Sequence, residues 1–108
     1  QNNKTKEYYS ELTEIVRGYI ERELKVPALE NTTDEVLEMI IAFKKSEAVD
    51  TSKETIGKLK DLLREADLVK FAKSKPLAIE IEDDRRDAEY IIGNLKPKPI
   101  IEKEDGLE

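Results

Sequence analysis

The amino-acid sequence predicts an all-α fold, a compact bundle of four helices in which the third helix is central. Apolar residues recur in four segments at the three- and four-residue spacing of an amphipathic helix. Only four glycines and four prolines interrupt a chain in which 41% of the residues are charged, a composition typical of helices. A length of 108 residues supports one domain with a single core.

The first helix is expected over residues 5–25, because its apolar residues fall on one stripe. This stripe consists of Tyr8, Leu12, Ile15, Val16, Tyr19 and Ile20. We expect Tyr8 and Tyr19 to lie in the core with their hydroxyls at its edge. Tyr9 falls outside the stripe and is therefore expected to be exposed and to contact a partner. Pro27 prevents the helix from continuing through Val26.

Capping signals mark the starts of the next two helices. Thr32 is followed three residues later by Glu35, the spacing of a capping box, which predicts a helix over residues 33–45. The same spacing of Thr51 and Glu54 predicts the start of the third helix, over residues 52–73. The loop between the two helices is short, so we expect them to pack antiparallel or at a steep angle.

The third helix has apolar residues that cannot all lie on one side. Its main stripe consists of Ile56, Leu59, Leu62, Leu63, Ala66 and Val69. Leu68, Phe71 and Ala72 fall outside this stripe. We therefore expect the last turns of this helix to be covered from more than one direction, which makes it the centre of the bundle.

A fourth helix is expected over residues 77–95, with Ser74 as its cap and Pro76 near its first turn. Its stripe consists of Leu77, Ile81, Ala88, Ile91, Ile92 and Leu95. We expect residues 1–4 to be a flexible N-terminus and residues 5–96 to form the single helical domain. Residues 97–108 are expected to form a mobile C-terminal tail with a cloning scar at 107–108.

The composition disfavours several functional classes. The chain has no cysteine and no histidine, which removes thiol nucleophiles, the commonest zinc ligands and the commonest general base. The net charge of −6 argues against nucleic acid and against an anionic membrane surface as partners. The chain contains no run of about 18 apolar residues that would span a membrane. We expect no catalytic residue and no cofactor.

Four carboxylates share one flank of the fourth helix, at a spacing that suits a hard cation. They are Glu80, Asp83, Asp84 and Asp87. The pattern lacks the glycine and the loop of a dedicated calcium site, and Arg85 and Arg86 lie among the carboxylates. We therefore expect a solvated acidic face and no metal site.

A helix-turn-helix-like nucleic-acid-binding domain is the alternative to a protein-binding domain. Lys53, Lys60 and Arg64 line one side of the third helix, and a short loop separates this helix from the one before it. Neighbouring acidic residues interrupt the basic stripe. Surface ion pairs therefore explain these cations better than phosphate contacts do.

Lys70 and Asp84 are charged residues that fall within apolar stripes. If the third and fourth helices face one another, Lys70 pairs with Asp84. Asp67, three residues before Lys70, is a more local partner. A third interpretation is that Lys70 extends its aliphatic stem over apolar surface to reach water. The residues alone leave these three interpretations open.

Two segments carry a resemblance to a known family. They are YYSELTEIVRGYIERELKVPALENTTDEVL, residues 8–37, and LLREADLVKFAKSKP, residues 62–76, and the strongest motif is Ala66–Lys73. These segments resemble an uncharacterised helical domain at the cytoplasmic end of single-span bacterial membrane proteins. Such proteins are commonly encoded beside MoxR-type AAA+ ATPases and von Willebrand A-domain proteins of the Bat aerotolerance group. The resemblance covers residues 8–95 and includes no catalytic signature.

The resemblance implies a non-catalytic protein–protein interaction module in an envelope-associated assembly. MoxR-type ATPases and von Willebrand A-domain proteins are the implied partners. The implied location is cytoplasmic, with a tether to the inner membrane through a segment upstream of Gln1, and the absence of a methionine at that position is consistent with this. The residues that we expect to serve the interaction are Tyr9, Lys70 and Lys73.

Overall fold

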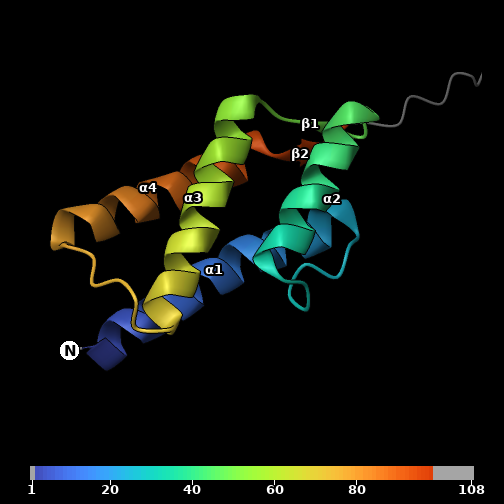
Figure 1. Ribbon diagram of the computed structural model, residues 1–108. Helices are drawn as coiled ribbons and strands as arrows, with labels where there is room; N and C mark the ends of the chain where they lie inside the picture. Colours follow the sequence, from blue (N-terminus) through green and yellow to red (C-terminus); the bar gives the residue numbers. More distant parts are fainter. Residues whose placement is uncertain (1, 99–108) are drawn as a thin grey trace, which may run out of the picture.

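The computed structural model describes residues 2–98, and the side chains of residues 4–98. Within these residues the chain forms four helices and one two-stranded sheet (Figure 1). The helices are α1 (Asn2–Leu24), α2 (Thr33–Lys45), α3 (Lys53–Lys70) and α4 (Ala78–Asn94), and the strands are β1 (Val49–Asp50) and β2 (Lys96–Pro97). The predicted all-α fold class is therefore confirmed. The expectations for residues 99–108, including the scar at 107–108, lie outside the described residues.

Helix α3 is central, as the sequence predicts, and contacts each of the other three helices. Figure 1 shows α3 crossing α1, with α4 on one side and α2 on the other. Its buried face consists of Leu59, Leu62, Leu63, Ala66 and Val69, and Ile56 packs against the same core. Burying one such leucine or valine contributes about 1.5–3 kcal/mol relative to leaving it exposed. Because this face meets three helices, it organises one continuous core.

Helix α1 packs most of the predicted stripe against the core, but Tyr9 and Ile15 depart from the prediction. Tyr9 is only 1% exposed, whereas Tyr8 and Tyr19 lie half-buried against the core. Ile15 is exposed, although it belongs to the predicted stripe. The prediction that Tyr9 is exposed is therefore wrong. The reason is that Tyr9 lies three, seven and eleven residues before the buried Leu12, Val16 and Ile20, which places it on the same face of the helix, and the predicted stripe left it out.

The capping box at the start of α2 forms as predicted, but α3 begins differently. Thr32 Oγ1 accepts a hydrogen bond from the Glu35 N–H at 3.2 Å, and Glu35 Oε1 accepts one from the Thr32 N–H at 2.9 Å. At α3 the cap is Ser52, whose Oγ accepts from the Thr55 N–H at 3.1 Å. Thr51 follows β1 directly, and its buried Oγ1 has no hydrogen-bond partner among the described residues. The helix therefore starts at Lys53, one residue later than predicted.

One side of the last turn of α3 is exposed although Val69 on the other side is buried, so the prediction that the last turns are covered from more than one direction is wrong. Leu68 and Phe71 are 45% and 64% exposed, and Ala72 is exposed too. The helix ends at Lys70, earlier than predicted. Residues 71–77 then carry the chain away from α3 before α4 begins (Figure 1). Neighbouring helices therefore cover α3 along its middle and leave its end open.

The start of α4 also differs from the prediction. Ser74 does not cap the helix, because its Oγ donates a hydrogen bond to Glu65 Oε2 on α3 at 2.6 Å. Leu77 occupies the cap position and is exposed, although the predicted stripe includes it. Its N–H donates to Glu80 Oε1 at 2.8 Å, so a carboxylate satisfies one of the unpaired donors of the first turn.

A short antiparallel sheet, which the sequence does not predict, lies at the end of the bundle away from the α3–α4 connection (Figure 1). In this sheet Val49 of β1 lies opposite Pro97 of β2. Val49 is buried, and so is Leu95, which precedes β2. Tyr19 of α1 donates a hydrogen bond to the Leu95 carbonyl at 2.8 Å. The sheet and this bond together fix the end of α4, and they bring Pro97 into the ordered domain.

Ala72 ends α3 in a backbone conformation that suits glycine. Its φ is +59°, and the N–H groups of Ala72 and Lys73 donate to the carbonyls of Val69 and Leu68 at 3.0 and 2.7 Å. This is the Schellman pattern, in which glycine is the usual residue. A residue with a Cβ is strained there by about 1–2 kcal/mol.

We expect Ala72→Gly to raise the free energy of unfolding by about 0.5–1 kcal/mol. Relief of the backbone strain exceeds the conformational entropy that glycine adds to the unfolded chain. The matched control is Ala42→Gly, at an exposed position within α2, which should lower the free energy of unfolding by about 1 kcal/mol. Chemical denaturation measures both changes, and a loss of stability in both variants would contradict the strain at Ala72.

Candidate functional site

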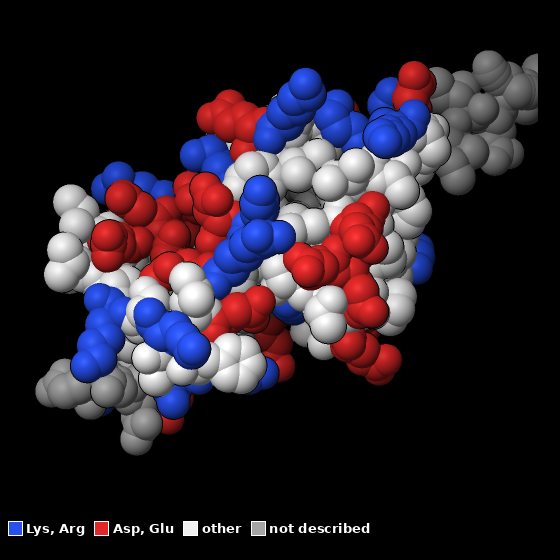
Figure 2. All heavy atoms as spheres, viewed as in Figure 1, with Lys and Arg blue, Asp and Glu red and all other residues white. Residues whose placement is uncertain are grey.

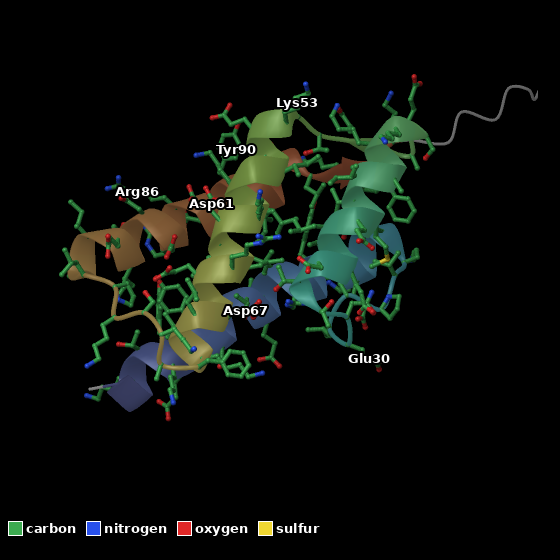
Figure 3. The ribbon with its side chains drawn as sticks, viewed as in Figure 1. Glu30, Lys53, Asp61, Asp67, Arg86 and Tyr90 are labelled. Atoms are coloured by element: carbon green, nitrogen blue, oxygen red, sulfur yellow. The ribbon has the colours of Figure 1, made fainter. Side chains whose placement is uncertain are left out.

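An open groove lies between α1, the α1–α2 connection and the end of α3, with a volume of about 580 Å³. We call it the α1–α3 groove. Its walls include Arg17, Leu29, Asp67, Lys70 and Phe71. In Figure 3, Asp67 on α3 marks one wall and Glu30 in the α1–α2 connection marks the other. The groove combines exposed apolar side chains with charges of both signs.

The guanidinium of Arg17 links three segments beside this groove. Its Nη1 donates to the carbonyl oxygens of Ala28 and Asn31 at 3.0 and 2.6 Å. Its Nη2 donates to Thr33 Oγ1 at 3.1 Å, and Thr33 Oγ1 donates in turn to Asp67 Oδ2 at 2.7 Å. One side chain of α1 therefore holds the α1–α2 connection, the start of α2 and, through a threonine, α3.

The charge of Arg17 is balanced within the protein. Burial lowers the pKa of Arg17, and the nearby Asp67 carboxylate opposes this shift. Asp67 also lies beside the start of α2, where backbone N–H groups favour an anion. An internal carboxylate thus occupies the position where a bound anion would be expected. We interpret this cluster as a structural link between helices.

A second groove, with a volume of about 440 Å³, runs between α3 and α4. We call it the α3–α4 groove. Five carboxylates line it together with Arg64, Leu68 and Ser74; they are Asp61 and Glu65 of α3 and Glu80, Asp83 and Asp84 of α4. Figure 2 shows acidic atoms gathered over the region between these two helices, and Figure 3 shows Asp61 on the side of α3 that faces α4. This groove therefore has a predominantly negative lining.

Asp84 is a half-buried carboxylate of the α3–α4 groove, and it accepts a hydrogen bond from the buried hydroxyl of Tyr9 on α1. Burial raises the pKa of Asp84, and the hydrogen bond from Tyr9 lowers it. Repulsion from three neighbouring carboxylates, those of Glu65, Asp87 and Asp83, raises it further, so the net shift is upward. Burial and the contact with Asp84 also raise the pKa of Tyr9, which therefore remains a hydrogen-bond donor.

The three predicted interaction residues lie in different surroundings. Tyr9 is buried and hydrogen-bonded within the domain, so it offers no exposed aromatic contact. Lys70 is exposed beside the α1–α3 groove, and its Nζ lies 5.6 Å from the centre of the Phe71 ring. Lys73 is exposed in the α3–α4 connection. Asp84 is paired with Tyr9, and Lys70 makes no ion pair with any described carboxylate, so the interpretation in which Lys70 reaches water is the one that fits.

The acidic side chains predicted to share a flank of α4 do not converge on one point. Asp84 bonds to Tyr9, whereas Asp87 pairs with Lys58 of α3 at 3.3 Å. Glu80 accepts from a backbone N–H at the start of its own helix. Within residues 2–98, no group of three or more acidic side chains is arranged to hold a metal ion. In the same part of the chain, no helix is both long enough and apolar enough to cross a membrane.

Four large apolar side chains around the α3–α4 connection are exposed, and the sequence did not identify them as a surface. They are Leu68, Phe71, Leu77 and Ile79, which are 45%, 64%, 66% and 69% exposed, and we call them the apolar rim. Two of them, Leu68 and Phe71, fall outside the main stripe of α3. Such a position is either buried by a second neighbour or left exposed, and periodicity alone does not separate the two cases.

Comparison of the chain with protein-family models, with curated proteins and with solved structures gives no match. The two grooves and the apolar rim are therefore the features from which a function can be inferred.

We expect the free energy of unfolding of Asp84→Asn to increase relative to that of the natural chain as the pH rises. The pKa of Asp84 is raised in the folded protein, so folding favours its protonated form. As the pH rises from about 4 through this raised value, the carboxylate ionises in a partly buried position and the folded state loses stability. Asparagine carries no charge and still accepts a hydrogen bond from Tyr9.

The measurement is the free energy of unfolding of both chains at a series of pH values. The difference, variant minus natural chain, should increase across this window. A difference that stays constant, or that falls with rising pH, would show that Asp84 ionises without a cost to the fold.

Proposed function

We propose that this domain is a non-catalytic protein–protein interaction module. The observation that carries the proposal is the apolar rim, in which four large apolar side chains are exposed around one connection. Burying a side chain of this size contributes about 1.5–3 kcal/mol relative to leaving it exposed. These four side chains lie at the end of α3, in the α3–α4 connection and at the start of α4, and large exposed apolar surfaces are typical of contact sites on proteins. A partner that covers the rim would gain this free energy.

The polar groups with shifted pKa values support a binding role rather than catalysis. Asp84 accepts its hydrogen bond from Tyr9, and Arg17 donates to backbone carbonyls and to Thr33. A catalytic acid or base must instead reach a proton on a substrate within a pocket. Asp84 and Arg17 are instead engaged in contacts within the fold, as groups with shifted pKa values in structural networks are.

The basic residues of α3 do not favour the helix-turn-helix alternative. Residues 46–52, which include β1, separate α2 from α3, whereas that motif has a turn of about 3–4 residues. Arg64 pairs with Asp34 of α2 at 3.1 Å, and Lys58 pairs with Asp87 of α4 at 3.3 Å. Cations engaged in this way, on a chain with a net charge of −6, are poorly suited to phosphate contacts.

The family resemblance makes MoxR-type ATPases and von Willebrand A-domain proteins the first partners to test. In this extension of the proposal, the domain faces the cytoplasm within an envelope-associated bacterial assembly. A segment upstream of Gln1 would tether it to the inner membrane. The resemblance of residues 8–37 and 62–76 is the support for this extension.

We expect a rim variant to lose its protein partner without losing its fold. Leu68→Ser, Phe71→Ser and Ile79→Ser together remove exposed apolar surface, so the free energy of unfolding should change by no more than about 1 kcal/mol. Co-purification of the co-expressed ATPase or A-domain protein with the natural chain, and not with the variant, is the predicted result.

The matched control for this experiment is Ile15→Ser with Ile41→Ser, which changes exposed apolar residues on α1 and α2 and should leave co-purification intact. Equal capture by the natural chain and the rim variant would contradict the rim as the contact surface. Failure of the natural chain to capture either protein would contradict the proposed partners.

A further inference from the structure

The acidic residues of α4 fall into two groups that differ in their partners. Away from the α3–α4 groove, Arg85 bonds to both Glu82 and Glu89, at 2.5 and 2.6 Å. Lys58 of α3 pairs with Asp87 at 3.3 Å. The carboxylates of this group are therefore neutralised by cations of the domain itself.

The carboxylates of the α3–α4 groove have mainly neutral partners. Glu65 accepts from the Ser74 hydroxyl, and Asp84 accepts from the Tyr9 hydroxyl. Asp61 has no hydrogen-bond or ion-pair partner in the described part of the chain.

Two arginines lie near these five carboxylates and balance only part of their charge. Arg86 lies 4.0 Å from Asp83, and this is the shortest distance between an oxygen lining the groove and a cation of the domain. Arg64 also borders the groove, but its guanidinium pairs with Asp34 on α2 at 3.1 Å. Among the described residues, Asp83 is the one groove carboxylate with a cation within 4.0 Å, so the five carboxylates of the groove outnumber the cations beside them.

The groove also offers apolar contacts. Leu68 lines it and is 45% exposed. Ile79, which is 69% exposed, lies one turn before Asp83 on the same side of α4. Apolar surface and uncompensated carboxylates are thus adjacent, and a partner that uses both must be amphipathic and positively charged.

We infer that the α3–α4 groove binds a basic amphipathic segment of a partner protein. Lysine or arginine side chains of this segment contact Asp61, Glu65 and Asp83, and its apolar side chains cover Leu68 and Ile79. The exposed Lys73 and Lys75 of the α3–α4 connection repel the lysine or arginine side chains of this segment, so they direct the segment along the groove. Charge complementarity of this kind raises the association rate and excludes acidic partners.

This inference rests on the proposed function and adds the chemical character of the partner. A divalent cation alone is a poorer occupant, because no three acidic side chains among residues 2–98 converge to hold one. A phosphate backbone has the wrong sign of charge for this surface.

The test uses a fluorescent amphipathic peptide of leucine and lysine, about 18 residues long, which is enough to form a helix on binding. Fluorescence anisotropy gives its dissociation constant, and NMR chemical-shift changes give its location. A variant with Asp61→Asn, Glu65→Gln and Asp83→Asn should bind about tenfold more weakly. The same peptide with glutamate in place of lysine should not bind.

The matched control is a variant with Glu7→Gln, Glu11→Gln and Glu38→Gln, exposed residues of α1 and α2 that do not line the groove. It has the same net charge as the groove variant and should bind within about twofold of the natural chain. Shift changes should concentrate on α3 and α4. Equal weakening in both variants, or shift changes on another face, would overturn the inference in favour of non-specific attraction.

Three further outcomes would also overturn it. These are the absence of binding by the basic peptide, shift changes in the groove on addition of Mg²⁺ alone, and a dimer of the natural chain that the groove variant disrupts. Capture of the protein partner separates this inference from the proposed function. If the rim variant loses that partner and the groove variant retains it, the proposed function stands, whereas the inference that the groove binds a basic segment is contradicted.

Discussion

Asp84 lies where α1, α3 and α4 meet and has no cationic partner among residues 2–98, and the surface around it depends on this constraint. Tyr9 of α1 donates the hydrogen bond that partly stabilises the charge, and Tyr9 is itself buried on the face of α1 that carries Leu12 and Val16. A partly buried carboxylate among other carboxylates is costly to ionise. The burial of Tyr9 and the negative α3–α4 groove are therefore parts of one arrangement.

Arg17 shows the opposite arrangement beside the α1–α3 groove. Its guanidinium donates to backbone carbonyls and to Thr33, and Asp67 supplies the opposite charge. The α1–α3 groove is the larger of the two, yet its buried charge is balanced within the fold. Volume alone would favour that groove as a binding site. The balance of charge instead favours the α3–α4 groove, where five carboxylates have two arginines beside them.

Local signals in the sequence predicted the helices well, and the candidate site poorly. The capping box of Thr32 depends on contacts three residues apart, so the start of α2 was predictable. The β1–β2 pairing joins segments far apart in the chain and has no periodic signature. The helix period places Tyr9 on the same face as Leu12, which the predicted stripe overlooked. The exposure of Leu68 and Phe71 depends on how the helices cross, which a helical wheel does not contain. The spacing of the carboxylates in α4 predicted that they share one flank of that helix. It did not predict that they lie opposite the carboxylates of α3.

The central claim is that cations of the described residues balance only part of the charge of the carboxylates in the α3–α4 groove. NMR titration of the Asp84 side-chain carboxyl in the natural chain tests this claim most directly. We predict a pKa above the ordinary value of about 3.9, and a decrease of this pKa when the basic peptide is added. An Asp84 pKa at or below the ordinary value in the absence of peptide would show that the charge is already balanced, and would contradict the account.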